Sequence, residues 1–230
     1  IAAAQAGANV VVLEKCSIDG GSTNVSEGAL NAVDPERQEP QGIEDSIDTF
    51  YQTTIDGGHG TGNPELVEYL VNNALDSVHW LEDLGVRFKD EVGSATGSLG
   101  QRSHYPYTPS GNTYIRSFED FQAAHADQLL VLNDVQATDL ILDDAGAVVG
   151  VKGLFKGDQE VTVNAKAVII ATGTFVCDKE MYENFTGKPW TYEEDPRSIV
   201  NGSPYNDYQA DGAGIKALLA VGVAPRYIIE

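Results

Sequence analysis

The fold class is decided at the start of the chain, where residues 1–15 read IAAAQAGANVVVLEK. Residues 1–6 are typical of the end of a helix, and Gly7 follows where helices favour a left-handed residue. Residues 10–13 form a continuous apolar run rich in β-branched side chains, the pattern of a strand buried on both faces. A helix that leads into such a strand is the second half of a βαβ unit. The sequence therefore predicts an α/β fold whose first strand we expect upstream of Ile1.

Glu14 stands at the carboxyl end of this apolar run. In dinucleotide-binding βαβ units, an acidic residue at the end of the second strand accepts hydrogen bonds from ribose hydroxyls. A carboxylate suits this task because it can accept from two vicinal hydroxyls at once. Judged on this residue alone, a surface carboxylate beside Lys15 is an equally good interpretation.

Two segments rich in small residues follow. Gly20, Gly21, Ser22 and Thr23 combine glycines, which let a backbone approach a phosphate or a ring closely, with hydroxyls that can donate to phosphate oxygens. Residues 26–32 (SEGALNA) form the second segment. An ordinary surface turn is the alternative, and the order of the segments favours a ligand site more than either segment does alone.

The clearest helix is predicted over residues 63–84. Asn63 suits the cap, Pro64 suits the first helical position, apolar residues recur at helical spacing, and Gly85 ends the pattern. Residues 17–62 and 89–116 are loop-like by composition, except for a short helix over residues 43–55. The remaining predicted elements are a helix over residues 117–126 and an antiparallel meander built from residues 129–132, 135–142, 148–155 and 161–163.

A second apolar run, AVIIA at residues 167–171, ends in Thr172 and Gly173. We expect another strand buried on both faces, with a compact turn at the carboxyl edge of the sheet, where ligands bind in open α/β sheets. Asp211 precedes a predicted helix over residues 212–219. It can cap that helix or meet a cofactor hydroxyl, and the two roles are compatible.

Composition restricts the class of partner. The 230 residues carry a formal charge of −21, which disfavours nucleic acid as a partner because phosphates are repelled. No apolar run approaches the roughly 18–20 residues that a membrane span needs. Two cysteines and four scattered histidines have no metal-ligand spacing, so no metal site is predicted. The cellular compartment stays open.

Taken in order, the segments resemble the flavoprotein subunits of fumarate reductase and succinate dehydrogenase, especially the soluble flavocytochrome-type fumarate reductases of bacteria. The matching segments are VVVLEK (10–15), GGST (20–23), SEGALNA (26–32), GNPELVEYLVNNALDSVHWLEDLGV (62–86), QRSHYP (101–106), AKAVIIATGTF (165–175) and ADGAGIKALLAVG (210–222). The resemblance implies a Rossmann-like α/β FAD-binding domain with an inserted α+β capping domain, cut at both ends of this chain.

The resemblance also implies an organisation in four segments. Residues 1–86 would be a partial FAD-binding domain, residues 87–134 a connecting helical segment, residues 135–222 the meander and the adenosine-side strand, and residues 223–230 the start of the capping domain.

Fifteen cofactor-binding residues are implied in the same way. Glu14 and Lys15 would meet the adenosine ribose, and Val135 would touch the adenine through its backbone. The others would lie along the pyrophosphate, the flavin ring and the adenosine end: Gly20, Gly21, Ser22, Thr23, Ser26, Gly28, Ala29, Leu30, Ala171, Thr172, Gly173 and Asp211.

This chain departs from the family pattern at three positions. The family commonly has Gly at Ala29, Asn at Ser22 and Gly at Thr174, so the chain is expected to be a divergent member. The family's catalytic histidines and arginines would lie beyond Glu230, and no catalytic residue is assigned within the chain. Arg102 and His104 are two residues apart and could bind a carboxylate, but the resemblance places them between the FAD-binding segments.

The resemblance implies an FAD-dependent oxidoreductase that transfers a hydride between flavin and an activated C=C bond, with fumarate or another unsaturated carboxylate as substrate. An electron-donor protein or a haem module is a conceivable partner. A ketosteroid dehydrogenase, or a non-catalytic FAD-binding piece, remains an alternative. A nicotinamide-binding α/β enzyme is disfavoured by the long insertion between the two apolar runs.

Overall fold

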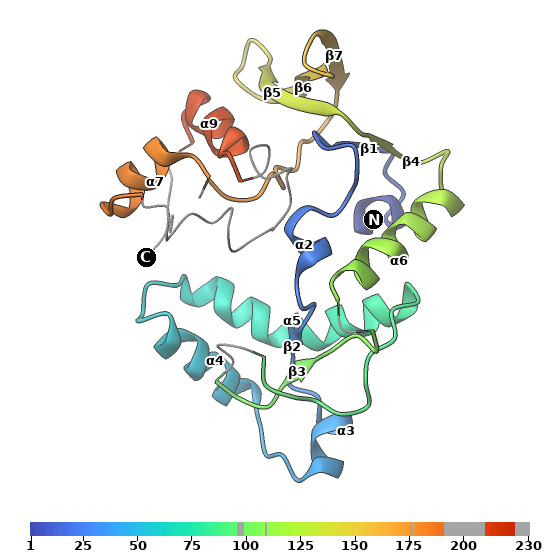
Figure 1. The fold of residues 1–230 in the computed structure, drawn as a ribbon, viewed down its shortest axis with the longest axis vertical. Helices are drawn as coiled ribbons and strands as arrows, with labels where there is room; N and C mark the ends of the chain where they lie inside the picture. The colour runs from blue at the N-terminus through green and yellow to red at the C-terminus, as the bar shows by residue number, and fades with distance from the viewer. Residues whose placement is uncertain (96–98, 109, 176, 191–209, 224–230) are drawn as a thin grey trace. The chain divides into compact units, whose positions relative to one another are not determined.

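The computed structural model describes residues 1–95, 99–108, 110–175, 177–190 and 210–223 (Figure 1). Its described helices are α1 (Ala2–Gln5), α2 (Gly21–Val25), α3 (Pro35–Gln38), the 3-10 turn η1 (Glu39–Gln41), α4 (Ile47–Gly57), α5 (Pro64–Asp83), α6 (Asn112–Ala124), α7 (Lys179–Thr186) and α9 (Ala213–Ala220). Its described strands are β1 (Val10–Leu13), β2 (Leu30–Asn31), β3 (Ser103–His104), β4 (Leu129–Leu132), β5 (Val135–Leu142), β6 (Val148–Phe155) and β7 (Gln159–Asn164).

The chain divides into two compact units. Unit 1 consists of Ile1–Ser22 and Ala124–Glu230, and unit 2 consists of Thr23–Ala123. The boundaries at residues 86, 134 and 222 were derived from the expected domain order of the family and not from contacts within the chain. They stay predictions. Residues 224–230, where the capping domain was expected to begin, lie outside the described residues.

Unit 2 is organised around α5, which confirms the strongest helix prediction. The Asn63 side chain accepts hydrogen bonds from the backbone of Glu65 and Leu66 at 3.0 and 3.4 Å, so it caps the helix as expected. Helix α4 lies alongside α5 (Figure 1). The short antiparallel pair β2–β3 joins Leu30 to His104 and Asn31 to Ser103.

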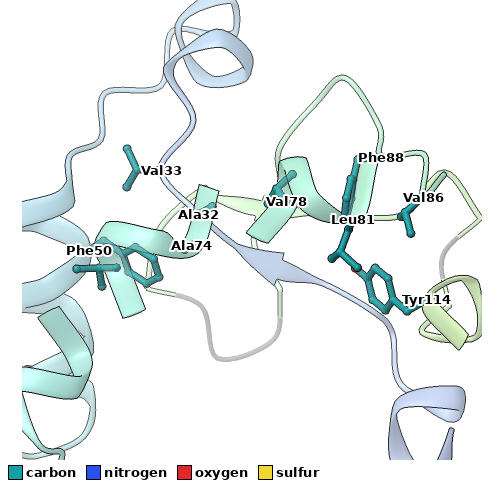
Figure 2. Close-up of a cluster of buried hydrophobic side chains, with 10 residues drawn as sticks. Ala32, Val33, Phe50, Ala74, Val78, Leu81, Val86, Phe88 and Tyr114 are labelled. Carbon is teal, nitrogen blue, oxygen red and sulfur yellow. The ribbon is translucent and has the colours of Figure 1, made fainter. Parts of the chain in front are cut away.

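One face of α5 builds the hydrophobic core of unit 2 (Figure 2). Val71, Ala74, Val78 and Leu81 are buried at helical spacing. The cluster is completed by Ala32, Val33, Phe50, Val86, Phe88 and Tyr114. Leu66 and Leu70, near the start of the helix, share the apolar spacing but are 65% and 54% exposed. His79 is exposed as well.

Unit 1 contains two small sheets. Strands β5, β6 and β7 form the predicted antiparallel meander. The sequence predicted that residues 129–132 belong to the meander, but β4 is not part of it. It pairs in parallel with β1, with Val10 opposite Leu129 and Leu13 opposite Leu132. Gln128 supports this pairing, because its side chain donates to the carbonyls of Ala4 and Ala8 beside α1.

Both predictions of strands buried on two faces need correction. In β1, Val11 and Val12 are 42% and 40% exposed. Residues 167–171 form no strand, and Ile169 is 82% exposed. An apolar run becomes a doubly buried strand only when neighbours pair with its edges and cover its faces. Among the described residues, β1 pairs with β4 alone, and residues 167–171 pair with no strand.

Several short elements escaped sequence reasoning. Residues 17–62 contain α2, β2, α3 and η1, and α7 was not predicted. Helix α6 begins at Asn112 instead of residue 117, because the Ser110 hydroxyl accepts from the Asn112 N–H at 3.1 Å and starts the helix early. In the described part of the chain, no helix combines the length and the apolar character that crossing a membrane requires.

Candidate cofactor site

The predicted ribose ligand, Glu14, lies where three strands of unit 1 meet. Its backbone N–H donates to the carbonyl of Leu132 at 3.0 Å, and its own carbonyl accepts from the N–H of Val135 at 2.9 Å. Its carboxylate Oε1 accepts from the Cys16 N–H at 2.7 Å. Within the described residues the second carboxylate oxygen has no hydrogen bond, so it is free to accept from a ligand hydroxyl. The N–H of Val135 is used, so a backbone contact from this residue to a ligand can come only from its carbonyl.

Lys15 and Asp211 are 196 residues apart and form an ion pair at 3.0 Å between Nζ and Oδ2. The other oxygen of Asp211 accepts from the Ala213 N–H at 3.0 Å, at the first residue of α9. Asp211 therefore contacts the first residue of α9 without being its N-cap, which is Gly212, and at the same time holds α9 next to the end of β1. Each partner remains partly exposed, with side chains 21% and 35% accessible.

The Thr-Gly turn lies against the same helix. The Gly212 N–H donates to the carbonyl of Thr174 at 3.2 Å. A Cβ on Gly214 would lie 2.0 Å from Thr172 Oγ1, so only glycine lets α9 approach the turn this closely. Thr172 therefore lies against the first turn of α9, and Lys15, the neighbour of Glu14, reaches the start of the same helix through Asp211, although residues 167–171 do not form the expected strand.

Gly20, Gly21 and Ser22 end the first segment of unit 1. Gly20 and Gly21 have φ of +108° and +47°, which glycine adopts without strain. A Cβ at Gly21 or at Gly173 would meet no described atom within 4 Å. These backbones are open to an approaching ligand, as are the exposed Ala171 and Thr172.

The remaining predicted residues, Thr23, Ser26, Gly28, Ala29 and Leu30, belong to unit 2, where they form one segment with the buried Ala32. Hydrogen bonds to backbone carbonyls hold the first residues of this segment, Thr23 and Ser26. The Ser26 N–H and hydroxyl donate to the carbonyl of Thr23, and the Gly111 N–H donates to the carbonyl of Ser26 at 2.9 Å.

Gly28 is held against the start of α6. A Cβ at this position would lie 2.8 Å from the backbone nitrogen of Gly111, and φ is +78°. The Tyr114 hydroxyl donates to the carbonyl of Gly28 at 2.5 Å. Burial raises the pKa of Tyr114 to about 12, so the phenol is a neutral donor at physiological pH. Packing and backbone conformation therefore require glycine at position 28.

A buried polar cluster supports the inner part of the segment, and sequence reasoning missed most of it. The cluster consists of Asp34, Arg37, Gln38, Asp45, Arg102, Ser103 and His104. Arg102 Nη2 and Nε pair with both oxygens of Asp45 at 2.7 and 2.8 Å, and its guanidinium lies 4.5 Å from the centre of the Phe50 ring. The Ala32 N–H donates to the carbonyl of Arg102 at 3.0 Å.

Gln38 joins the carboxylate of Asp45 to the backbone of Asp34 and Gln101. Its amide nitrogen donates to Asp45 Oδ2 at 3.0 Å and to the carbonyl of Gln101 at 2.8 Å, while its amide oxygen accepts from the Asp34 N–H at 2.8 Å. The sequence signal available for Asp34 was the Asp-Pro pair, because Asp34 caps α3 and Pro35 begins it. No local sequence pattern predicts that Asp45 binds Arg102 or that Tyr114 binds the carbonyl of Gly28.

Arg102 and His104 are thus components of the interior of unit 2, with 3% and 0% exposure. The carboxylate-binding role considered for this pair does not fit, because both side chains are buried and the guanidinium already binds Asp45 through Nε and Nη2 and Thr53 through Nη1. Among the described residues no group of three His, Cys, Asp or Glu side chains is arranged to hold a metal ion.

Comparison with known proteins gives one family match over nearly the whole chain. The model of the FAD binding domain family matches residues 1–225. A probable fumarate reductase of Shewanella frigidimarina is 31% identical over 183 residues, which cover 79% of this chain and 31% of that protein.

Two solved structures share the fold. The open conformation of a flavocytochrome c3 fumarate reductase superposes with a TM-score of 0.81 and 28% identity, covering 97% of this chain and 38% of the other. A 3-ketosteroid-Δ4-(5α)-dehydrogenase from Rhodococcus jostii gives a TM-score of 0.75 and 25% identity, covering 96% of this chain and 50% of the other. The chain therefore spans about a third of the curated relative that it matches.

Proposed function

This chain belongs to the FAD binding domain family, and from that membership we propose that it supplies part of the FAD site of an oxidoreductase acting on an activated C=C bond. Fumarate, or another small unsaturated carboxylate, is the proposed substrate, since a fumarate reductase is similar in sequence and another in structure. Bound flavin would supply hydride transfer, while the protein supplies binding and orientation.

One observation supports this proposal most: the ion pair between Lys15 and Asp211 and the approach of Thr172 to α9 join three distant parts of the sequence at the first turn of this helix. The donor set fits an adenosine. Glu14 keeps one carboxylate oxygen for a ribose hydroxyl, and the backbones at Gly21 and Gly173 leave room for a ligand.

We assign the following roles within this proposal. Glu14, Lys15 and Val135 would bind the adenosine, together with Ala171, Thr172, Gly173 and Asp211. Gly20, Gly21, Ser22 and Thr23 would approach the pyrophosphate and the flavin. Ser26, Gly28, Ala29 and Leu30 would follow the flavin ring. Groups that bind the carboxylate and deliver a proton would lie in the two thirds of the relatives' length that this chain does not span, as would most of a capping domain that begins at residues 223–230.

A ketosteroid dehydrogenase is the second candidate, and the likeness to the Rhodococcus jostii enzyme favours it. The two candidates share FAD and differ in substrate. A reduced-donor assay with fumarate, compared with a dye-linked assay on a 3-ketosteroid, distinguishes them, because only the matching substrate should change the flavin absorbance.

The cofactor proposal is tested by the colour of the protein that contains this chain. We expect a yellow protein that releases FAD on denaturation, and a colourless protein that takes up no added FAD would refute the proposal. Replacing Glu14 by Ala should weaken FAD binding, as measured by flavin fluorescence titration. The matched control is Glu160→Ala, an exposed carboxylate on β7. Equal affinities in the two variants would make Glu14 an ordinary surface carboxylate.

For residues 1–230 alone, we propose weak or absent retention of FAD. The pyrophosphate turn of the family precedes the segment that matches residues 1–15, and this turn contributes much of the binding in dinucleotide folds. Stoichiometric binding by residues 1–230 would overturn this part of the proposal while leaving the family's cofactor unchanged.

A further inference from the structure

We propose that His104 is a buried imidazolium, protonated on both ring nitrogens, and that it is a positioning residue which ties the carbonyl of Leu30 to the carboxylate of Asp34. The proposal concerns the charge of a side chain in unit 2 and can be tested without any cofactor. Its consequence for flavin binding, given below, rests on the proposed function.

The hydrogen-bond partners of His104 are all acceptors. Nδ1 lies 3.2 Å from the carbonyl of Arg102 and 3.3 Å from the carbonyl of Leu30. Nε2 lies 3.0 Å from Asp34 Oδ2. A backbone carbonyl can only accept, so Nδ1 must carry a proton. A neutral imidazole has only one N–H, and its Nε2 lone pair would then face a carboxylate oxygen.

A proton on Asp34 instead of His104 would also fill this contact, but the surroundings of Asp34 favour its carboxylate. Burial alone would raise the pKa of Asp34, yet this pKa lies below its usual value, and the side chain and backbone of Arg37 both contribute to lowering it. Asp34 Oδ2 accepts from Arg37 Nη1 at 2.8 Å, and Oδ1 accepts from the Arg37 N–H at 3.3 Å. An acceptor that already receives a guanidinium is a poor place for a proton.

Charge balance in the cluster leads to the same assignment. The negative groups are Asp34 before α3, Asp45 before α4 and Glu82 in α5. The positive groups are Arg37 in α3 and Arg102 before β3, paired with Glu82 at 2.5 Å and with Asp45 at 2.7 Å. With His104 protonated, three positive charges face three negative ones. With His104 neutral, Asp34 and Glu82 would share the single guanidinium of Arg37, which leaves an excess of negative charge in a largely buried cluster.

The ring of His104 is completely buried, so water cannot replace a lost hydrogen bond. It joins the cap of α3 to β2, whose Leu30 lies in the segment of residues 26–32, and Phe88 packs against it at 87° with 6.1 Å between ring centres. If that segment follows the flavin ring as proposed, His104 fixes its position through the carbonyl of Leu30. The sequence motif RSH at residues 102–104 is then explained by the pairing of Arg102 with Asp45 and of His104 with Asp34 inside unit 2.

The charge of His104 can be read directly by NMR of the 15N-histidine-labelled chain. The sequence contains four histidines, and the spectrum of His104→Gln identifies the signal of His104. At about pH 8, where an ordinary imidazole is neutral, we expect imidazolium shifts for both nitrogens of His104. The shift pattern of a neutral tautomer at that pH would overturn the proposal.

Asp34→Asn tests the pairing. Asparagine also caps helices, and its amide can donate to Nε2, so His104 should become neutral while Nδ1 keeps its proton. The matched control is Asp45→Asn, which removes an equally buried carboxylate that faces Arg102 instead of the ring. His104 should stay an imidazolium there. An imidazolium that persists in Asp34→Asn, or one lost equally in both variants, would refute the pairing. Should Asp34→Asn fail to fold, the spectrum of the unchanged chain still decides the charge.

Discussion

Units 1 and 2 differ in how far their apolar segments are buried. In unit 2, Val78 is completely buried and lies among side chains from α4, α5 and α6 and from the neighbouring loops. In unit 1, Ile169 is 82% exposed although its surroundings, AVIIA, are among the most apolar of the chain. The comparison shows that apolar character does not bury a segment by itself. Burial requires partners, and unit 2 contains its own, whereas the described part of unit 1 leaves two runs partly uncovered.

The two tryptophans allow the units to be followed separately, since Trp80 lies in unit 2 and Trp190 in unit 1. In a Trp190→Phe background, fluorescence during urea unfolding reports on unit 2, and in a Trp80→Phe background it reports on unit 1. Each prediction below compares a change in one unit with a matched change in the other.

The largest effect is expected from breaking the buried ion pair of unit 2. Arg102→Met leaves Asp45, whose side chain is 4% exposed, without its cation, and should lower the free energy of unfolding of unit 2 by about 3–5 kcal/mol. In unit 1, Lys216 pairs with Asp178 but is 54% exposed, so Lys216→Met should cost less than about 1 kcal/mol. Similar losses in the two variants would show that burial does not distinguish these pairs.

A glycine pair gives the next largest difference. Both Gly28 and Gly173 have φ near +80°, which costs an alanine roughly 1 kcal/mol. At Gly28 the new Cβ would also press on the backbone of Gly111, and at Gly173 it would meet no described atom within 4 Å. Urea titration should therefore show a loss of about 2–4 kcal/mol for Gly28→Ala and about 1 kcal/mol for Gly173→Ala. Equal losses would mean that unit 2 relaxes around the added methyl group.

A side-chain truncation compares the interiors directly. Val78→Ala removes two buried methyl groups and should destabilise unit 2 by about 2 kcal/mol, counting the cavity. Ile169→Ala should change the stability of unit 1 by less than about 0.5 kcal/mol, because the side chain already contacts water. A large loss at Ile169 would reveal that residues outside the described set cover it.

The smallest effect concerns acid. The lowered pKa of Asp34 means that its stabilising contribution is complete above the carboxyl's unfolded value, 3.8, and is lost as the pH falls through the lower value of the folded protein. The stability of unit 2 should therefore decline below about pH 4. Asp34→Asn should flatten this decline, whereas a control such as Asp158→Asn, in the exposed turn between β6 and β7, should not. An unchanged acid profile in Asp34→Asn would contradict the assignment.

Local chemistry allowed some of the fold to be predicted from the sequence. The helix after Asn63, the strand at residues 10–13 and the meander are encoded by caps, apolar periodicity and turn residues, which act over a few positions. The same reasoning placed Asp211 at a helix start and Glu14 at a strand end. It failed for the start of α6, which a serine decides, and for residues 167–171, which pair with no strand among the described residues.

The sequence by itself determined the family, the order of the cofactor segments and the capped helix, because each of these depends on neighbouring residues or on a recognisable series. Only the tertiary structure decided that Lys15 meets Asp211 across 196 residues, that Gly28 is fixed by Gly111 and Tyr114, and that His104 faces three acceptors and no donor. Those contacts join distant parts of the chain. The forces that stabilise them, hydrogen bonding and charge pairing, are short in range and exist only after folding has brought the groups together.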